Sequence, residues 1–422
     1  MRVAASVTHE ELRARVGEMY KSFVNPGRFR LASLMSLDKI EAEARGCIIR
    51  TADGDEYLDC LGSFGVFNVG HNHPKVIEAV ERQLRKMPLS TRFLLSEPLA
   101  ELGARLAAIT PEGITYMFPV HSGACAVEGA LKLARAATGR QEIVATHGAF
   151  HGKSFGALSA SGKDYFKDPF RPLVPEFKHV PYGDSDAAAR AVSERTAAFI
   201  VEPIQGEAGV IIPPDGYLRD LRETCDRNGA LLIVDEVQTG LGRTGAWFGC
   251  DHDGVAPDIM TMAKALGGGV MPLAAFVGNE RAFGPLIEDP YLHSTTIESH
   301  CAFAAACATI DVIREEGLVE RSRDMGAYLL QQIREVARSY PDVVTDVRGR
   351  GLMVAMDFVE KGHGGIVLAA MLDQKILVGF SFNNPQTIRL EPPLVISKAE
   401  VDRAVSGLAY AFEQARQVMS YS

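Results

Sequence analysis

The sequence predicts an α/β protein with a mostly parallel sheet, joined to a smaller α+β unit. Two observations lead to this prediction. Between residues 114 and 277, short apolar runs alternate with segments of helical periodicity, which is the pattern of repeated βα units. After Pro341 the pattern changes to short strands mixed with two helices, which indicates a second unit. The chain has 422 residues, enough for two or three domain-sized parts.

The part before residue 114 contains helices, one hairpin and one unusual loop. The hairpin covers residues 47–59 and turns at Asp53-Gly54, a dipeptide that suits a tight turn. The loop at residues 60–74 is rich in glycine and aromatic residues, and Pro74 is placed to begin a helix. The predicted helices are 9–36, with a break at Asn25-Pro26-Gly27, Lys75–Lys86 and Pro98–Ile109.

The central part alternates strands with helices. The predicted strands are Ile114–Pro119, Glu142–Thr146, Ala197–Val201, Leu231–Asp235, Ile259–Ala263 and Leu273–Val277. The predicted helices are Ala126–Thr138 and Tyr217–Asn228, and the segment His300–Arg338 predicts two more that meet near Gly317. Residues 290–296 are expected to form a loop.

The C-terminal unit has three predicted strands, Val343–Arg348, Leu352–Phe358 and Thr387–Leu390, and two helices, Gly365–Gln374 and Ala399–Met419. We therefore expect residues 1–70 to be an N-terminal part of the small domain. Residues 71–325 would form the large domain and residues 326–422 the C-terminal small domain.

Charge and composition limit the classes of partner. A net charge of −9 argues against nucleic acid or an anionic membrane as the main partner. No apolar run is long enough to span a bilayer, and the first ten residues lack the apolar core of a secretory signal. The seven cysteines are scattered, with no Cys-x-x-Cys, which favours reduced thiols in a cytoplasmic protein over disulfides or a metal site.

One lysine stands where an amine can become reactive. The apolar run Ile259–Ala263 leads directly to Lys264, which precedes three glycines. Burial lowers the pKa of a lysine and makes its amine nucleophilic. A strand-end lysine that extends its head to solvent is the simpler alternative.

An aspartate ends the preceding predicted strand. Asp235 follows the apolar run Leu231–Val234, at the carboxyl end of a buried strand, where α/β sheets place their sites. A Schiff-base lysine with an aspartate at the pyridinium nitrogen is the pairing expected of pyridoxal phosphate. Asp235 and Lys264 can therefore hold two parts of one ring, although a capping aspartate beside an unrelated lysine remains an alternative.

Two turns of small residues suit the same cofactor. His121-Ser122-Gly123-Ala124-Cys125 opens a helix, and the free N–H groups of a helix N-terminus bind phosphate. Gly148-Ala-Phe150-His151-Gly152 places an aromatic ring between glycines, where it can stack on a flat cofactor. Taken alone, Phe150 is equally a core residue and His151 a loop histidine.

A third glycine-rich string points to a different cofactor. Gly240-Leu-Gly242-Arg-Thr-Gly245 follows a strand and matches the dinucleotide fingerprint. However, a segment rich in helix breakers, residues 246–257, follows it in place of a helix. A nicotinamide enzyme is therefore the weaker interpretation.

Longer strings carry a family resemblance. They are Val201–Val210, Asp235–Gly245, Pro257–Ile259, Lys264–Gly269 and Ile388–Leu394. With them the chain resembles the class III, fold-type-I pyridoxal-phosphate aminotransferases, the family of ornithine and 4-aminobutyrate aminotransferases. The strings Leu58–His71, Gly148–Ala160 and Lys264–Pro272 are most similar to the putrescine aminotransferase branch.

The resemblance implies a fold and a cofactor. It implies an aspartate-aminotransferase-like fold, in which the large domain has a mostly parallel seven-stranded sheet. The small α+β domain would be built from both termini. Pyridoxal 5′-phosphate would be the cofactor.

The resemblance also implies a role for each matching residue. Lys264 would hold the cofactor and move the proton, and Asp235 would keep the ring nitrogen protonated. The other cofactor contacts would be Gln238 at the ring oxygen, Phe150 on the ring face, Ser122, Gly123 and Ala124 at the phosphate, and His151 and Glu202 nearby. Thr295 would reach the phosphate of the neighbouring subunit, so a homodimer with shared sites is expected, alone or as a dimer of dimers.

Four residues concern the substrate. Arg389 matches the family's carboxylate-binding arginine and Glu207 the glutamate that pairs with it. Such a pair closes for a bare amine and opens for a carboxylate. Lys153 replaces an arginine that clamps a distal carboxylate in ornithine and 4-aminobutyrate aminotransferases. Phe64 stands where ornithine aminotransferases carry a tyrosine.

These residues predict transfer of a terminal primary amino group to a 2-oxo acid such as 2-oxoglutarate or pyruvate. The donor would be a putrescine-like diamine or another ω-amine, and in reverse the substrate would be an aldehyde. Two strings depart from the family: Ala124-Cys125 replaces Thr-Glu, and Ile297–Cys301 replaces an aromatic, two glycines, Asn and Pro. The alternatives are an aminotransferase of specialised metabolism for a larger amine or aldehyde, an aminomutase or epimerase, and a non-catalytic cofactor-binding module.

Overall fold

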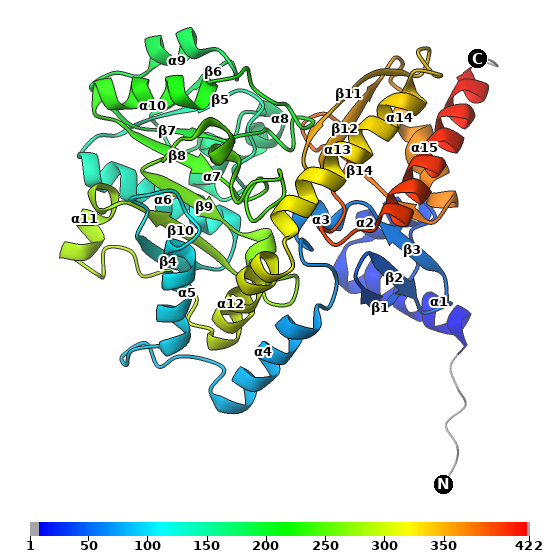
Figure 1. Ribbon diagram of the computed structural model, residues 1–422, viewed down its shortest axis with the longest axis horizontal. Coiled ribbons are helices and arrows are strands. Elements are labelled where there is room, and N and C mark those ends of the chain that lie inside the picture. The colour runs from blue at the N-terminus through cyan, green and yellow to red at the C-terminus, as the bar shows by residue number, and fades with distance from the viewer. Residues whose placement is uncertain (1–7, 420–422) are drawn as a thin grey trace.

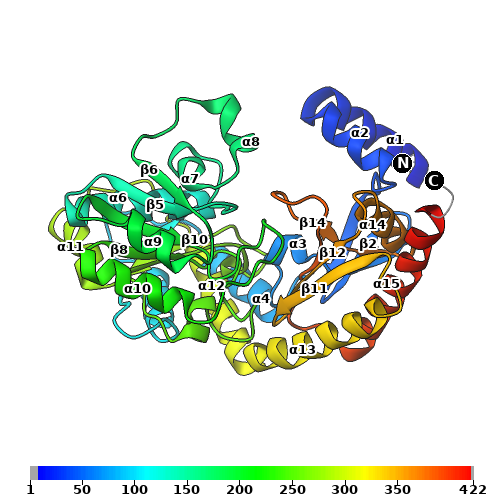
Figure 2. The ribbon, with the colours of Figure 1, turned by 90° about the horizontal axis from the view of Figure 1, so that it is seen from above.

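The computed structural model describes residues 8–419, which form two parts (Figures 1 and 2). The larger part surrounds one large sheet. In the smaller part the first strands of the chain, drawn in blue, lie beside the last helix, drawn in red (Figure 1). The expectation about a secretory signal rests mainly on residues 1–7, which lie outside the described range. Within residues 8–419, no helix is both long and apolar enough to cross a membrane.

The large sheet has seven strands in the order β4-β10-β9-β8-β7-β5-β6. They are β4 (Tyr116–Val120), β5 (Glu142–Thr146), β6 (Phe177–Val180), β7 (Thr196–Val201), β8 (Leu231–Asp235), β9 (Ile259–Met262) and β10 (Ala274–Gly278). β10 is antiparallel to β4 and β9, and the remaining pairs are parallel. The prediction of a mostly parallel seven-stranded sheet is confirmed.

Helices cover both faces of this sheet (Figure 2). The helices of the larger part are α4 (Pro74–Lys86), α5 (Glu97–Ala107), α6 (Gly123–Thr138), α7 (Phe155–Ala160), α8 (Asp164–Lys167), α9 (Ser185–Ala191), α10 (Tyr217–Asn228), α11 (Glu280–Glu288) and α12 (His300–Glu315). Short 3-10 turns are η2 (Asp168–Phe170), η3 (Gly249–Asp253) and η4 (Lys264–Gly267). α6 lies close to the sheet because Gly129 leaves room for Phe276, whose ring a Cβ would meet at 2.3 Å.

The smaller part has two sheets. The first, in the order β1-β2-β3-β13, consists of β1 (Glu41–Arg45), β2 (Ile48–Thr51), β3 (Glu56–Asp59) and β13 (Ile376–Leu377). The second, β11-β12-β15-β14, consists of β11 (Val344–Arg350), β12 (Met353–Phe358), β15 (Ile388–Leu390) and β14 (Gly379–Phe380). β3 pairs with β13, so this part is built from both ends of the chain, as predicted.

The helices of the smaller part are α1 (His9–Met19), the π-helical η1 (Tyr20–Val24), α2 (Pro26–Leu34), α3 (Gly62–Gly65), α13 (Leu318–Ala337), α14 (His363–Asp373) and α15 (Lys398–Met419). The predicted break near Gly317 is present, since α12 and α13 meet there in the left-handed conformation (φ 61°). The expected boundary at residue 325 falls inside α13, and the three-way division of the chain stays a prediction.

Several elements escaped the sequence pattern. β1 reads Glu-Ala-Glu-Ala-Arg and is mostly exposed, so it has no alternating apolar face. β6 is a four-residue strand at the edge of the large sheet. α11 contains Pro285, a residue that normally argues against a helix. The predicted hairpin at residues 47–59 is confirmed, because β2 and β3 pair antiparallel.

One buried arginine ties the two parts together. Arg243, in the loop after β8, is fully buried. Its Nη1 donates to the carbonyl oxygens of Leu352 at 2.8 Å and Pro392 at 2.6 Å, and its Nη2 donates to Asn68 Oδ1 at 2.6 Å. Burial lowers the pKa of Arg243 to about 10. One side chain of the large part thereby fixes three distant segments of the small part.

Candidate active site

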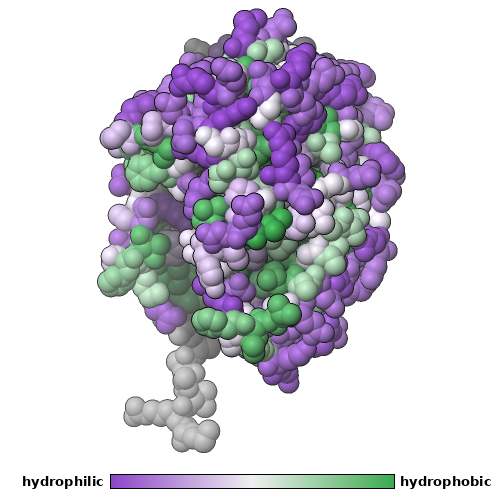
Figure 3. Space-filling view, turned by 90° about the vertical axis from the view of Figure 1, so that its left-hand side faces the viewer, coloured by the Kyte–Doolittle hydropathy of each residue, from purple (hydrophilic) through white to green (hydrophobic). Residues whose placement is uncertain are grey.

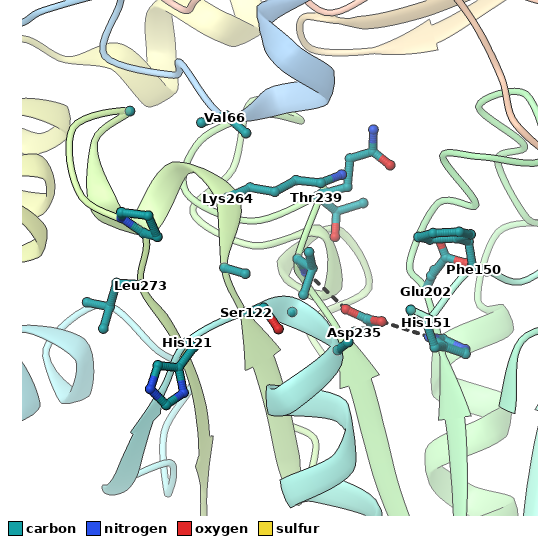
Figure 4. Close-up of a pocket in the computed structure, with 18 of the residues that line it drawn as sticks. Val66, His121, Ser122, Phe150, His151, Glu202, Asp235, Thr239, Lys264 and Leu273 are labelled. Atoms are coloured by element: carbon teal, nitrogen blue, oxygen red, sulfur yellow. Dashed lines mark hydrogen bonds and ion pairs between the residues drawn. The ribbon is translucent and has the colours of Figure 1, made fainter. Parts of the chain in front are cut away.

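A cavity of about 530 Å³ lies at the carboxyl ends of the central strands (Figure 4). Nine of the predicted residues line it: Ser122, Gly123, Ala124, Phe150, His151, Glu202, Asp235, Gln238 and Lys264. Phe64, Lys153, Glu207, Thr295 and Arg389 do not line this cavity directly. Its size is that of a site for a cofactor or a small substrate.

Asp235 is held at the end of β8 by three donors. Its Oδ1 accepts from Thr261 Oγ1 at 2.8 Å and from the backbone N–H of Val237 at 3.1 Å. His151 Nδ1 lies 2.7 Å from its Oδ2. Burial opposes protonation of His151, but the hydrogen bond to Asp235 and the charges of Asp235 and Glu202 together outweigh it and raise the pKa of His151. These contacts satisfy the carboxylate and fix it in a buried place.

Lys264 extends across the cavity above Asp235 (Figure 4). β8 and β9 are parallel neighbours, with Asp235 opposite Thr261, so the two predicted strand ends are adjacent. Lys264 follows β9 after one residue, Ala263. Its backbone has the left-handed conformation (φ 46°), which is strained for a lysine. Burial lowers the pKa of Lys264, and no carboxylate of residues 8–419 forms an ion pair with it. Such an amine is suited to act as a nucleophile and as a base.

The N-terminus of α6 faces the same cavity. Ser122 is the N-cap, and its Oγ accepts from the backbone N–H of Cys125 at 3.3 Å. Gly123 and Ala124 occupy the first turn, where backbone N–H groups have no partner within the helix. A Cβ on Gly123 would stand 3.1 Å from the side chain of Val237. This end of α6 has the chemistry of a phosphate site.

Phe150 and Glu202 form the wall of the cavity on the side of His151, away from Leu273 (Figure 4). The backbone N–H of Phe150 donates to Glu202 Oε1 at 2.9 Å, and that of Gly206 donates to Oε2 at 3.3 Å. Burial raises the pKa of Glu202 to about 7, and the charge of Asp235 acts in the same direction. Glu202 thus fixes the turn that carries the aromatic ring.

Arg389 and Glu207 form a buried ion pair. Arg389 is 0% exposed, and its Nη2 donates to both carboxylate oxygens of Glu207, at 2.8 and 2.9 Å. The Nε and Nη1 atoms of Arg389 have no hydrogen-bond partner among the described residues. The guanidinium lies over the ring of Phe64, 4.6 Å from its centre. Unused donors on a buried arginine mark a place where an anion can bind.

Two residues that sequence reasoning missed complete these contacts. Glu391 is fully buried and accepts from Gln238 Nε2 at 2.9 and 3.0 Å, and it lies 4.0 Å from Arg389 Nη1. Thr261 bonds Asp235. Thr261 is the single polar residue of an otherwise apolar strand, and that pattern is a signal for a buried hydrogen bond.

The remaining predicted residues lie outside the cavity. Lys153 is exposed, with its Nζ 4.1 Å from the ring centre of Phe166. Thr295 is exposed on the loop before α12. The structure of one chain thus brings together the predicted cofactor residues and leaves Thr295 facing outward.

The chemistry of the cavity fits pyridoxal 5′-phosphate. Asp235 offers a charged acceptor for a pyridinium N–H, Lys264 an unpaired amine, and α6 a phosphate site. Phe150 supplies a ring to stack against the cofactor. The orphaned Nε2 of the buried His151 agrees with a neighbouring group that the chain itself does not supply.

Comparisons with known proteins agree with this site. Residues 35–412 match the profile of the family Aminotransferase class-III. The ornithine aminotransferase from Toxoplasma gondii, whose structure has pyridoxal phosphate at partial occupancy, is similar with a TM-score of 0.88 and 28% identity, over 99% of this chain and 97% of that one. A transaminase from the marine bacterium Virgibacillus is similar with a TM-score of 0.89 and 30% identity, over 96% of this chain and 100% of that one. An (S)-enantioselective omega-transaminase from Thermomicrobium roseum is similar with a TM-score of 0.87 and 31% identity, over 97% of this chain and 99% of that one.

Proposed function

Because the chain belongs to the class-III aminotransferases, which depend on pyridoxal 5′-phosphate, we propose that it transfers a terminal primary amino group. The donor is a primary amine without a carboxylate beside its amino group, such as putrescine or another ω-amine. The acceptor is a 2-oxo acid such as 2-oxoglutarate or pyruvate. In reverse, the enzyme aminates the corresponding aldehyde.

The closed Arg389–Glu207 pair is the observation that carries this proposal. In the closed state, Glu207 neutralises the arginine and Phe64 covers its face, 4.6 Å away. The charge on Arg389 is therefore compensated without any ligand, so a donor that lacks a carboxylate leaves no buried charge unpaired. Removing a partner from a buried ion pair costs about 3–5 kcal/mol, so the pair stays closed until an anion replaces Glu207.

The same pair serves the second half of the reaction. A 2-oxo acid brings a carboxylate that can accept from Nη2 in place of Glu207 and from the unused Nε and Nη1. A bidentate carboxylate–arginine contact then compensates for the displaced glutamate. One pocket can in this way accept a bare amine and an acid in turn.

Each cofactor residue has one proposed task. When bound, the cofactor supplies the electron sink for breaking a C–H bond. Lys264 Nζ would remove a proton from the carbon that bears the amino group and deliver it to the carbon on the other side of the nitrogen, a 1,3-transfer. Asp235, positioned by His151, would accept the N–H of the ring nitrogen, and Gln238 would bond the ring oxygen. Ser122, Gly123 and Ala124 bind the phosphate.

A homodimer with shared sites belongs to this proposal. Arg92 Nη2 donates to the carbonyl oxygen of Ser294 at 3.0 Å, so the segment after α4 is joined to the loop of Thr295. This segment exposes large apolar side chains: Leu89, Phe93, Leu94 and Leu95. Figure 3 shows hydrophobic side chains gathered low on one face of the large part. An exposed apolar patch supports a partner surface, and a second copy would bring Thr295 to its neighbour's phosphate.

A donor panel on the purified holoenzyme tests the function. Putrescine, a monoamine of equal length and an α-amino acid are each added without acceptor, and the absorbance of the bound cofactor is followed. We expect the two uncarboxylated amines to convert the cofactor, and 2-oxoglutarate to restore it. The α-amino acid that corresponds to the acceptor should convert the cofactor as well, because the acceptor half-reaction is reversible. Continuous turnover without any 2-oxo acid would instead indicate an aminomutase or epimerase.

A further inference from the structure

A row of three aromatic rings begins at the Arg389–Glu207 ion pair. The rings of Phe64 and Phe382 are 5.3 Å apart, centre to centre, and those of Phe150 and Phe382 are 6.3 Å apart. Phe64 and Phe150 belong to the first 150 residues of the chain, whereas Phe382 follows β14 in the small part. Phe382 therefore bridges two rings that are far from it in sequence.

Phe382 leaves a large apolar surface exposed beside the cavity. It is 50% exposed, although its neighbour Ser381 is fully buried. The ammonium of Lys153 lies 5.7 Å from the Phe382 ring centre and 6.0 Å from that of Phe150, with no ion pair of its own within residues 8–419. Burying an aromatic ring against another apolar group stabilises a complex, and Phe382 is positioned to do this for a ligand.

The backbone that carries Phe382 is bonded to the switching glutamate. The N–H of Phe382 donates to Glu207 Oε2 at 3.0 Å, and the N–H of Asn383 donates to the carbonyl oxygen of Glu207 at 2.9 Å. Asn383 Nδ2 also donates to the carbonyl oxygen of Gly148 at 2.7 Å, in the turn of Phe150. Oε2 of Glu207, one of the two oxygens that accept from Arg389, thus also holds the backbone of Phe382.

We propose that Phe382 is a specificity-determining residue which, with Phe64 and Phe150, binds the apolar body of the amine donor while Glu207 is paired with Arg389. This inference rests on the proposed aminotransferase function and narrows it to amines with an aryl or similarly bulky apolar group. When a 2-oxo acid displaces Glu207 from Arg389, the bond to the Phe382 N–H is disturbed as well. The aromatic wall is therefore complete in the donor half of the reaction and loosened in the acceptor half.

Two amines that differ only in a phenyl group test the specificity. The holoenzyme and its Phe382→Ala variant are mixed with n-propylamine or 3-phenylpropylamine, and kcat/KM is taken from the absorbance change of the bound cofactor. We expect Phe382→Ala to lower kcat/KM about 10-fold for 3-phenylpropylamine and less than about 2-fold for n-propylamine. Phe170→Ala, which removes a ring of similar exposure (54%) outside the row, serves as the matched control and should change neither value.

A double-mutant cycle tests the link to Glu207. In the Glu207→Gln background, the loss caused by Phe382→Ala on 3-phenylpropylamine should shrink from about 10-fold to about 2-fold. A glutamine that gives its one oxygen to Arg389 has none left for the Phe382 N–H, so the ring loses one of the bonds that position it. A loss that stays 10-fold in both backgrounds would show that Glu207 does not position Phe382. Phe382 is half exposed, so the variant should fold, and its retained cofactor absorbance verifies this.

The two proposals fail in different ways. If the wild-type enzyme converts neither of these amines nor putrescine, the proposed donor class is wrong. If it converts putrescine but neither of these amines, the donor class stands and the aromatic wall is overturned. If it converts both, but Phe382→Ala lowers both values equally or not at all, the donor class stands and the aromatic wall is overturned.

Discussion

Replacing Glu207 with glutamine should raise the affinity of the site for 2-oxo acids. In the wild type, Arg389 Nη2 makes two contacts with Glu207, at 2.8 and 2.9 Å, which a carboxylate ligand has to displace. A hydrogen bond to a charged group contributes about 1.5–3 kcal/mol, toward the upper end when both partners are charged and toward the lower end when one partner is neutral. Glutamine can offer Arg389 one uncharged oxygen. Displacement should therefore become easier by about 1–2 kcal/mol, which is about 5–30-fold in affinity.

The assay isolates the acceptor half of the reaction. Enzyme converted to its aminated form is mixed with increasing 2-oxoglutarate, and the return of the cofactor absorbance gives the concentration for half-maximal rate. In Glu207→Gln this concentration should fall by about 5–30-fold, which means tighter binding of the acceptor. The value of kcat/KM for an uncarboxylated amine should decrease, because the charge on Arg389 is left poorly paired.

A matched control breaks a similar pair elsewhere. Arg105 Nε donates to both oxygens of Asp311, at 3.1 and 3.2 Å, away from the cavity. Asp311→Asn should leave both half-reactions unchanged. The reasoning is refuted if Glu207→Gln binds 2-oxoglutarate no more tightly than the wild type while it keeps its fold and cofactor.

Three further outcomes follow from the site. Lys264→Ala should lower turnover by about 10²–10⁴-fold or more while the protein remains folded, since the amine moves the proton; steady-state turnover at near-normal rate would contradict this. The pKa of Glu202 is raised to about 7 in the folded protein, so the folded state binds the proton more tightly than the unfolded state and stability falls as pH rises from about 4.5 to 7. Glu202→Gln should remove about 1–3 kcal/mol of that loss, visible as a smaller decrease in the melting temperature between pH 5 and 7.5; an identical decrease in both proteins would argue against it. Thr295→Ala should weaken cofactor binding about 5-fold in a dimer that sedimentation confirms, whereas the neighbouring exposed Ser294→Ala should not; equal cofactor affinity in all three proteins would remove Thr295 from the site.

The strands around the site were predictable because they are buried on both faces. β8 and β9 are apolar except for Asp235 and Thr261, and such runs indicate strands of a buried parallel sheet. Since parallel strands end at one edge of a sheet, Asp235 and Lys264 were expected to lie together, as they do. The edge strands β1 and β6 lack that signal, since solvent covers part of their residues. Their existence depends on neighbours that no local pattern reveals.

The contacts between distant segments were less predictable. Glu391 lies within a recognisable string, yet only the folded chain shows that it bonds Gln238, 153 residues away in sequence. Phe382 has no periodic apolar neighbours that would mark it, and its place follows from how the small part sits against the large one. Pairings of this kind are set by tertiary packing rather than by local sequence.

The buried Arg243 also limits how the enzyme can move. Rotating the small part away from the large part would strip three hydrogen bonds from a charged group that has no water to replace them. We therefore expect motion during turnover to be larger in the exposed segment of Phe382 than at the junction that Arg243 holds. Ligand exchange in this enzyme should accordingly leave the position of the small part relative to the large part unchanged.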